Sequence, residues 1–119
     1  MKTTTEIGNI AESRARKYLE KNGLKHIDSN FKFHDVGEVD LIMRDGDYLV
    51  FTEVRMRRSR KYGTSIESIS RTKQRRIIRA ALAYLQREKS LNKEKCRFDA
   101  VGVDAEDKII WIKNAFEVQ

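Results

Sequence analysis

Two carboxylates that strand alternation places near each other are the residues best suited to chemistry in this chain. Residues 39–56, VDLIMRDGDYLVFTEVRM, alternate in the manner of two strands joined by a turn-forming DGD triplet. If the loop is Gly46-Asp47, Asp40 lies directly opposite Glu53, and if the loop is Asp45-Gly46, the two acids are diagonal neighbours. In both registers the two carboxylates share one face, with Cβ atoms about 5 to 8 Å apart.

Such a pair is a candidate site for a divalent cation. Like charges this close repel each other, so a cation that offsets the repulsion would explain them. Mg²⁺ prefers oxygen ligands and typically takes one or two protein carboxylates together with substrate phosphates. Arg55 follows Glu53 on the same face, where its guanidinium could neutralise Glu38 or reach a phosphate. The alternative is a solvated strand end with cross-strand ion pairs, each of which contributes little.

Composition predicts one globular domain with a polyanionic partner. The chain has 119 residues, of which 39% are hydrophobic and 36% charged, and no linker-like segment, so we expect a single domain over residues 1–119. The net charge of +7 favours nucleic acid, because Lys and Arg that neutralise phosphates release counterions. No apolar run is long enough for a bilayer and no signal peptide is recognisable, so we expect a cytoplasmic protein without a membrane partner. The single Cys96 excludes an internal disulfide.

Positive charge is concentrated after the second strand and along a later helix. Residues 55–61, RMRRSRK, continue from the carboxylate end of that strand, and the helix expected at 71–89 carries arginines at every fourth position. Exposed basic faces also occur without nucleic acid, but beside a carboxylate pair such a face is placed to hold a phosphate backbone. The candidate nucleic-acid-binding residues are Arg57, Arg58, Arg60, Lys61, Lys73, Arg75, Arg76 and Arg79.

Seven elements must position these side chains, in the order α-β-β-β-α-β-β. A capping box at Thr3 and apolar residues at helical spacing predict a helix over 3–21. On that helix Glu12 either pairs with Arg16 at the surface or faces a site beside the helix, and the sequence alone favours the pair. Val39 and its alternating neighbours form an apolar face that a helix must cover. Further expected segments are strands at 24–33, 96–103 and 109–112, with the helix at 71–89 making a parallel crossover in a mixed sheet.

Together these motifs resemble the YraN-like family of small bacterial proteins. The resemblance covers nearly the whole chain and rests on Glu12, on GEVD at Gly37 to Asp40 and on FTEVRMR at Phe51 to Arg57. That family is similar to Holliday-junction resolvases of the PD-(D/E)xK, restriction-endonuclease-like group. The resemblance implies an α/β fold, restriction-endonuclease-like, with a central mixed β-sheet flanked by helices. Resolvase relatives act as dimers, so it also raises the expectation of a homodimer.

The resemblance further implies a site and a reaction. Asp40 and Glu53 would bind Mg²⁺ or Mn²⁺, with the Val54 carbonyl as a further ligand and Glu12 as the first-helix acid near the metal. The reaction would be phosphodiester hydrolysis on branched or single-stranded DNA, and the implied catalytic residues are Glu12, Asp40, Glu53 and Arg55.

Arg55 departs from the family's usual E-x-K strand. Arginine retains the positive charge and its fit to phosphate, but it does not release its proton. Three functions therefore stay open at the level of sequence: a metal-dependent endonuclease, an inactive nucleic-acid-binding module of the same fold, and a basic domain that docks an acidic protein.

Overall fold

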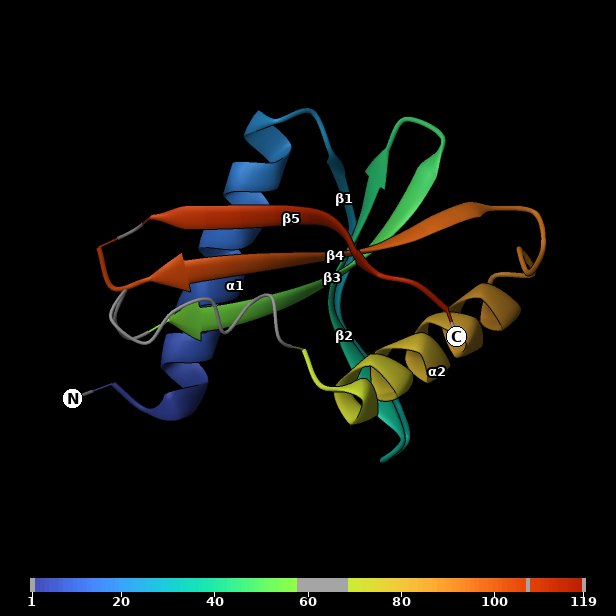
Figure 1. Cartoon of the computed structure of the whole chain (residues 1–119), viewed down its shortest axis with the longest axis horizontal. Coiled ribbons are helices and arrows are strands. Elements are labelled where there is room, and N and C mark those ends of the chain that lie inside the picture. The colour runs from blue at the N-terminus through green and yellow to red at the C-terminus, as the bar shows by residue number, and fades with distance from the viewer. Residues whose placement is uncertain (1, 58–68, 107, 119) are drawn as a thin grey trace.

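A computed structural model describes residues 2–57, 69–106 and 108–118. Within them a five-stranded sheet of order β1-β2-β3-β4-β5 lies between two helices (Figure 1). The β3–β4 pair is parallel and the other pairs are antiparallel, so the sheet is mixed, as predicted. The predicted element order is confirmed and is consistent with a restriction-endonuclease-like α/β fold. The elements are α1 (Thr4–Lys21), β1 (Lys25–Phe33), β2 (Gly37–Asp45), β3 (Tyr48–Arg57), α2 (Arg71–Arg87), β4 (Lys95–Asp104) and β5 (Ile109–Phe116).

Helix α1 begins and ends as the sequence predicts. Its first turn is capped by Thr3, whose side chain accepts the Glu6 N–H at 3.1 Å. At the other end Gly23 has φ +95°, a conformation that glycine adopts without strain. The apolar side of α1 covers the predicted apolar face of the hairpin, and the buried residues of this layer are Ala11, Ala15, Leu19, Leu24, Leu41, Met43, Val50, Val101 and Val103.

Strand β2 leaves regular alternation at Asp40. Val39 was expected beside Leu41 but is buried in the opposite core layer, beneath α2, so that prediction is wrong. The pairing of β2 with β3 ends at Leu41 and Thr52, and beyond it the Asp40 carboxylate accepts the Val54 N–H at 2.8 Å. A side-chain hydrogen bond thus takes the place of a backbone hydrogen bond between the strands. Beyond it the two strands diverge, so that β2 extends toward α2 and β3 extends toward α1 (Figure 1).

Helix α2 covers the second face of the sheet. Ser70 caps it by accepting the Lys73 N–H at 3.1 Å, and the helix ends at Arg87, two residues before the predicted limit. Gly37 brings the start of β2 very close to α2, because a Cβ added at Gly37 would lie 1.9 Å from the Arg76 carbonyl oxygen. This contact fixes the first turns of α2 against the end of β2 that carries Asp40.

Strands β4 and β5 are joined by a buried carboxylate. Asp99 is 0% exposed and accepts hydrogen bonds from Arg97 Nε at 3.0 Å, Trp111 Nε1 at 2.9 Å and the Asn114 N–H at 3.0 Å. Arg97 also donates to Asp45 Oδ2 at 2.8 Å, which ties β4 to the hairpin. Trp111 is therefore a packing residue, and β5 runs four residues beyond its predicted end. No helix in the described part of the chain is long and apolar enough to cross a membrane.

Candidate active site

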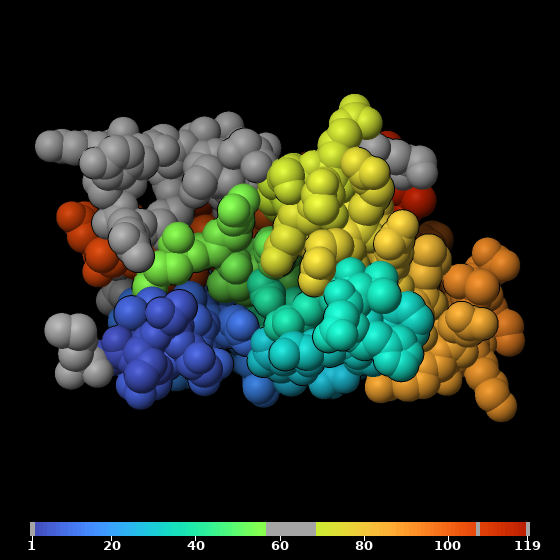
Figure 2. Space-filling model, turned by 90° about the horizontal axis from the view of Figure 1, so that it is seen from below, coloured from blue at the N-terminus to red at the C-terminus, as the bar shows by residue number. Residues whose placement is uncertain are grey.

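The diverging ends of β2 and β3 open a cavity of about 490 Å³ between the two helices. On this face α1 (blue), the end of β3 (green) and the first turns of α2 (yellow) come together (Figure 2). All four residues of the predicted catalytic set line the cavity, together with one predicted DNA-binding residue. Its lining residues are Gly8, Ala11, Glu12, Asp40, Glu53, Val54, Arg55, Met56, Ser70 and Lys73.

The hairpin adopts the first of the two predicted registers. Asp45 pairs with Tyr48, so Gly46-Asp47 is the loop, and Gly46 has φ +58° as a glycine-first turn requires. Glu53 is 5% exposed and shares a hydrogen bond with Asp40. Burial, followed by the proximity of Asp40, raises the pKa of Glu53 to about 8, although Lys73 acts in the opposite direction. The pair therefore retains a proton in conditions where two ordinary carboxylates would both ionise.

Glu12 faces this pair from α1. The surface pairing with Arg16 is wrong, because Arg16 Nε lies 3.4 Å from Glu20 Oε1, one turn further along the helix. Burial raises the pKa of Glu12, and the charge of Asp40 raises it further, while a hydrogen bond with the Asn30 side chain lowers it. A half-buried acid beside two others is thus a member of the site and not a surface residue.

The donor set suits a small divalent cation. Asp40 and Glu53 offer carboxylate oxygens, and Val54, which lines the same cavity, has a backbone carbonyl oxygen. Mg²⁺ and Mn²⁺ prefer oxygen ligands of these kinds. Across residues 2–57, 69–106 and 108–118 there is no cluster of three or more His, Cys, Asp or Glu side chains that could hold a metal ion together. Glu12 is therefore a neighbour of the candidate metal pair and not a third ligand in this arrangement. A two-carboxylate site leaves positions for water and phosphate.

Lys73, one of the predicted DNA-binding residues, also contacts the carboxylate pair. It was grouped with the backbone-binding arginines, yet its Nζ lies 3.5 Å from Glu53 Oε2. No local spacing could indicate this contact, because it joins a strand to a helix across the segment 58–70. Arg55 lines the same cavity, and Glu38, one of the two partners considered for Arg55, has its Oε2 3.9 Å from Lys32 Nζ.

The other predicted DNA-binding residues are only partly described. Arg75, Arg76 and Arg79 are exposed on α2, outside the cavity. Arg57 is the last residue of β3, and Arg58, Arg60 and Lys61 lie outside the described residues.

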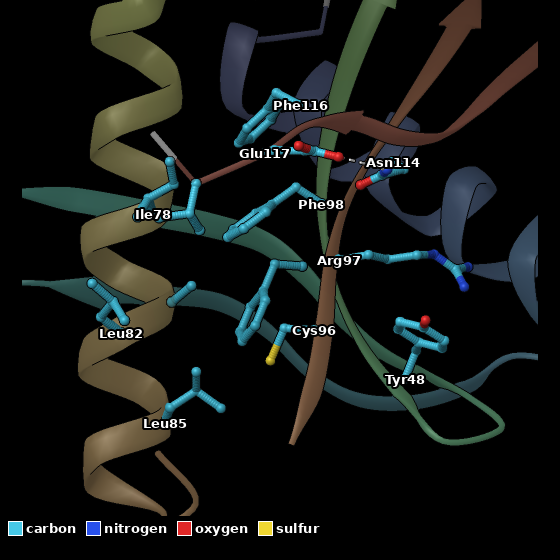
Figure 3. Close-up of a pocket in the computed structure, with 13 residues that line it drawn as sticks. Tyr48, Ile78, Leu82, Leu85, Cys96, Arg97, Phe98, Asn114, Phe116 and Glu117 are labelled. Carbon is cyan, nitrogen blue, oxygen red and sulfur yellow. Dashed lines mark hydrogen bonds between the residues drawn. The ribbon is translucent and has the colours of Figure 1, made fainter. Parts of the chain in front are cut away.

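A second cavity, of about 560 Å³, offers no comparable chemistry. It lies between α2 and strands β3 to β5, and its walls are mainly apolar side chains such as Leu82, Leu85 and Phe98 (Figure 3). Arg97 points away from it toward Tyr48, with its guanidinium carbon 5.6 Å from the ring centroid. Burial raises the pKa of the Cys96 thiol, so this cysteine stays protonated at neutral pH.

Comparison with known proteins identifies the family. The family described as "Uncharacterised protein family UPF0102" matches residues 11–103. A UPF0102 protein of Coxiella burnetii (strain RSA 493 / Nine Mile phase I) is 48% identical over 116 residues, which cover 98% of this chain and 96% of the relative. One from Nitrosococcus oceani is 43% identical over 120 residues, with 98% and 96% covered, and one from Ectopseudomonas mendocina is 40% identical over 119 residues, with 98% and 99% covered. The chain belongs to the UPF0102 family, the one that its YraN-like motifs indicated.

Proposed function

We propose that this protein is a metal-dependent endonuclease that hydrolyses phosphodiester bonds in branched or single-stranded DNA. The observation that carries the proposal is the composition of one cavity. Its floor holds the buried Glu53 and the half-buried Asp40, and its walls carry the cationic side chains Arg55 and Lys73. The carboxylates can bind a metal ion, and the neighbouring cationic side chains can bind a phosphate. The cavity thus matches both the positive and the negative part of a metal–phosphodiester complex.

The Asp40–Glu53 pair would hold Mg²⁺ or Mn²⁺, with the Val54 carbonyl as a further ligand. A divalent cation there would supply Lewis-acid activation of water and neutralise charge on the reacting phosphate. The Val54 N–H fixes one oxygen of Asp40, which orients the carboxylate before any ligand arrives. Such preorganisation matters because a carboxylate that must reorient loses part of its binding free energy to ordering.

Glu12 and Arg55 complete the proposed arrangement. The raised pKa of Glu12 makes its carboxylate a stronger base than that of an exposed glutamate, which suits it to accept a proton from water. Arg55 would bind the phosphodiester through its planar fork of N–H donors and would not exchange protons. Proton transfer would therefore fall to the first-helix acid and not to the strand cation.

The basic surface of α2 would hold the rest of the DNA. Arg75, Arg76 and Arg79 are exposed on the helix whose first turn contributes Lys73 to the cavity. Such a row would bind the sugar–phosphate backbone without base preference and would make affinity strongly salt-dependent. A homodimer stays a prediction, to be tested by sedimentation.

Metal binding and cleavage test the proposal together. The wild type and Asp40→Asn would be titrated with Mn²⁺ in a calorimeter and assayed on a four-way junction and on single-stranded DNA. The wild type should bind Mn²⁺ and cut at least one substrate, and Asp40→Asn should do neither while still binding DNA. Glu20→Gln, which alters an exposed carboxylate of α1, is the control and should behave like the wild type. A wild type that neither binds Mn²⁺ nor cleaves DNA would refute the proposal.

One observation favours a second candidate, a DNA-binding module without turnover. The strand position that usually carries lysine is Arg55, which cannot transfer a proton. Such a module should bind junction DNA with a steep salt dependence but leave it intact with Mn²⁺ present.

A further inference from the structure

Contacts of the α2 backbone determine where the Lys73 side chain begins. Its N–H is bound by the Ser70 cap, and one turn later the Arg76 carbonyl lies against Gly37. Both contacts are short, and Gly37 belongs to the strand that carries Asp40 three residues later. The distance from the Lys73 backbone to the carboxylate pair is therefore fixed by the fold, and only the side chain is free to move.

The Lys73 ammonium group lines the cavity but stays partly in contact with solvent. Lys73 Nζ is 3.5 Å from Glu53 Oε2, and the lysine side chain is 47% exposed whereas that of Glu53 is 5% exposed. Water competes for the exposed ammonium group, which weakens its attraction to Glu53. The contact is therefore weak enough for a stronger cation to displace, and Lys73 can leave it without being buried elsewhere.

A divalent cation would compete for the same oxygen. Asp40 and Glu53 are the proposed ligands, and Glu53 Oε2 is the atom that Lys73 contacts. Once a doubly charged ion neutralises the pair, the attraction that holds the ammonium on Glu53 is largely removed. The three N–H donors of Lys73 then remain beside a cavity that also contains Arg55 and Glu12, where a substrate phosphodiester would be a further anion for them to bind.

We propose that Lys73 is an exchangeable cation, which occupies Glu53 in the metal-free protein and transfers to the substrate phosphate when a divalent metal binds. This inference rests on the proposed function. The family's usual E-x-K strand carries a lysine at the position of Arg55, and we assign the part of that lysine to Lys73 on α2. It makes the phosphate contact of Lys73 conditional on metal, unlike the contacts of the exposed arginines on α2.

The test separates metal affinity from DNA affinity. Mn²⁺ binding without DNA would be measured by calorimetry, and binding of a fluorescent junction by anisotropy, with Ca²⁺ or with EDTA, at several salt concentrations. For Lys73→Gln we expect Mn²⁺ affinity to rise about twofold to fivefold, because a competing cation is removed. With Ca²⁺, junction affinity should fall about fivefold to tenfold at 0.1 M salt and the salt slope should fall by about one, whereas with EDTA both should stay near wild type.

Two variants serve as controls. Arg79→Gln removes the same charge from the exposed side of the same helix, so it should weaken DNA binding equally with Ca²⁺ and with EDTA. Lys73→Arg retains the charge and should keep the wild-type salt slope with Ca²⁺. The inference is overturned if Lys73→Gln weakens Mn²⁺ binding, or if its DNA defect is the same with and without Ca²⁺. A wild type that binds no Mn²⁺ would overturn both the inference and the proposed function, whereas normal Mn²⁺ binding with a metal-independent Lys73 defect would overturn the inference alone.

Discussion

Replacing Glu53 with glutamine should make the metal-free protein more stable at pH 8 and should remove much of its pH dependence. The folded protein raises the pKa of Glu53 from 4.5 to about 8. Below pH 4.5 the group is protonated in both the folded and the unfolded chain. As the pH rises from 4.5 to 8, the unfolded chain releases this proton while the folded chain keeps it, so stability falls through that window. Glutamine cannot ionise and can still donate a hydrogen bond to Asp40.

The size of the effect follows from the width of that window. One pH unit corresponds to about 1.4 kcal/mol, so the upper limit between pH 5 and pH 8 is about 4 kcal/mol. Side chains and water rearrange around a buried charge and reduce its cost. We therefore expect the stability difference between the wild type and Glu53→Gln to change by about 2 kcal/mol over this range. For a domain of this size that corresponds to a difference in melting temperature of roughly 6 to 12 °C.

The measurement is thermal or urea unfolding of both proteins at several pH values from 5 to 8, with EDTA present. The free energy of unfolding of the wild type should fall relative to Glu53→Gln as the pH rises, and the difference should be largest at pH 8. Glu20→Gln, altered at an exposed carboxylate, should follow the wild type at every pH. If the wild type and Glu53→Gln change in parallel between pH 5 and pH 8, the site does not hold Glu53 in a protonated state and the reasoning fails.

Three further substitutions test how the fold positions the site. Gly37→Ala should cost about 2 to 4 kcal/mol in urea unfolding, because its Cβ would overlap the Arg76 carbonyl. Gly8→Ala, with open space around the added carbon in α1, should instead be neutral or stabilising, and equal effects at the two glycines would contradict the close approach. Asp99→Asn should lower the free energy of unfolding by about 3 to 5 kcal/mol, because it leaves the charge of Arg97 less compensated, and it should alter Trp111 fluorescence. A loss of stability below about 1 kcal/mol would show that the network is dispensable.

Local patterns predicted the elements and the carboxylate pair. The capping residues of α1 and the apolar spacing of both helices are properties of short segments, and each was found where the sequence placed it. The glycine-first turn at Gly46 is one of the two loops that the sequence allowed. The hairpin was enough to bring Asp40 beside Glu53, because period-two alternation and loop length determine register. The family resemblance added Glu12, which helical periodicity alone had assigned to the surface.

The remaining features depend on contacts between distant segments. Lys73 reaches Glu53 only because α2 is docked by Gly37, and neither residue is close to Glu53 in the sequence. Val39 changes face because the Asp40 carboxylate accepts the Val54 N–H and interrupts the ladder, an event that hydrophobic alternation cannot indicate. Both departures occur at the site itself, where sheet regularity is given up so that carboxylates can converge.

A crystal soaked with Mn²⁺ would test most directly the claim that Asp40 and Glu53 form a metal site. The account predicts one anomalous density peak within about 2.0 to 2.3 Å of a carboxylate oxygen from each residue, and no such peak in Asp40→Asn. An anomalous map without a peak between these two carboxylates, at Mn²⁺ concentrations that occupy known sites in other proteins, would contradict it.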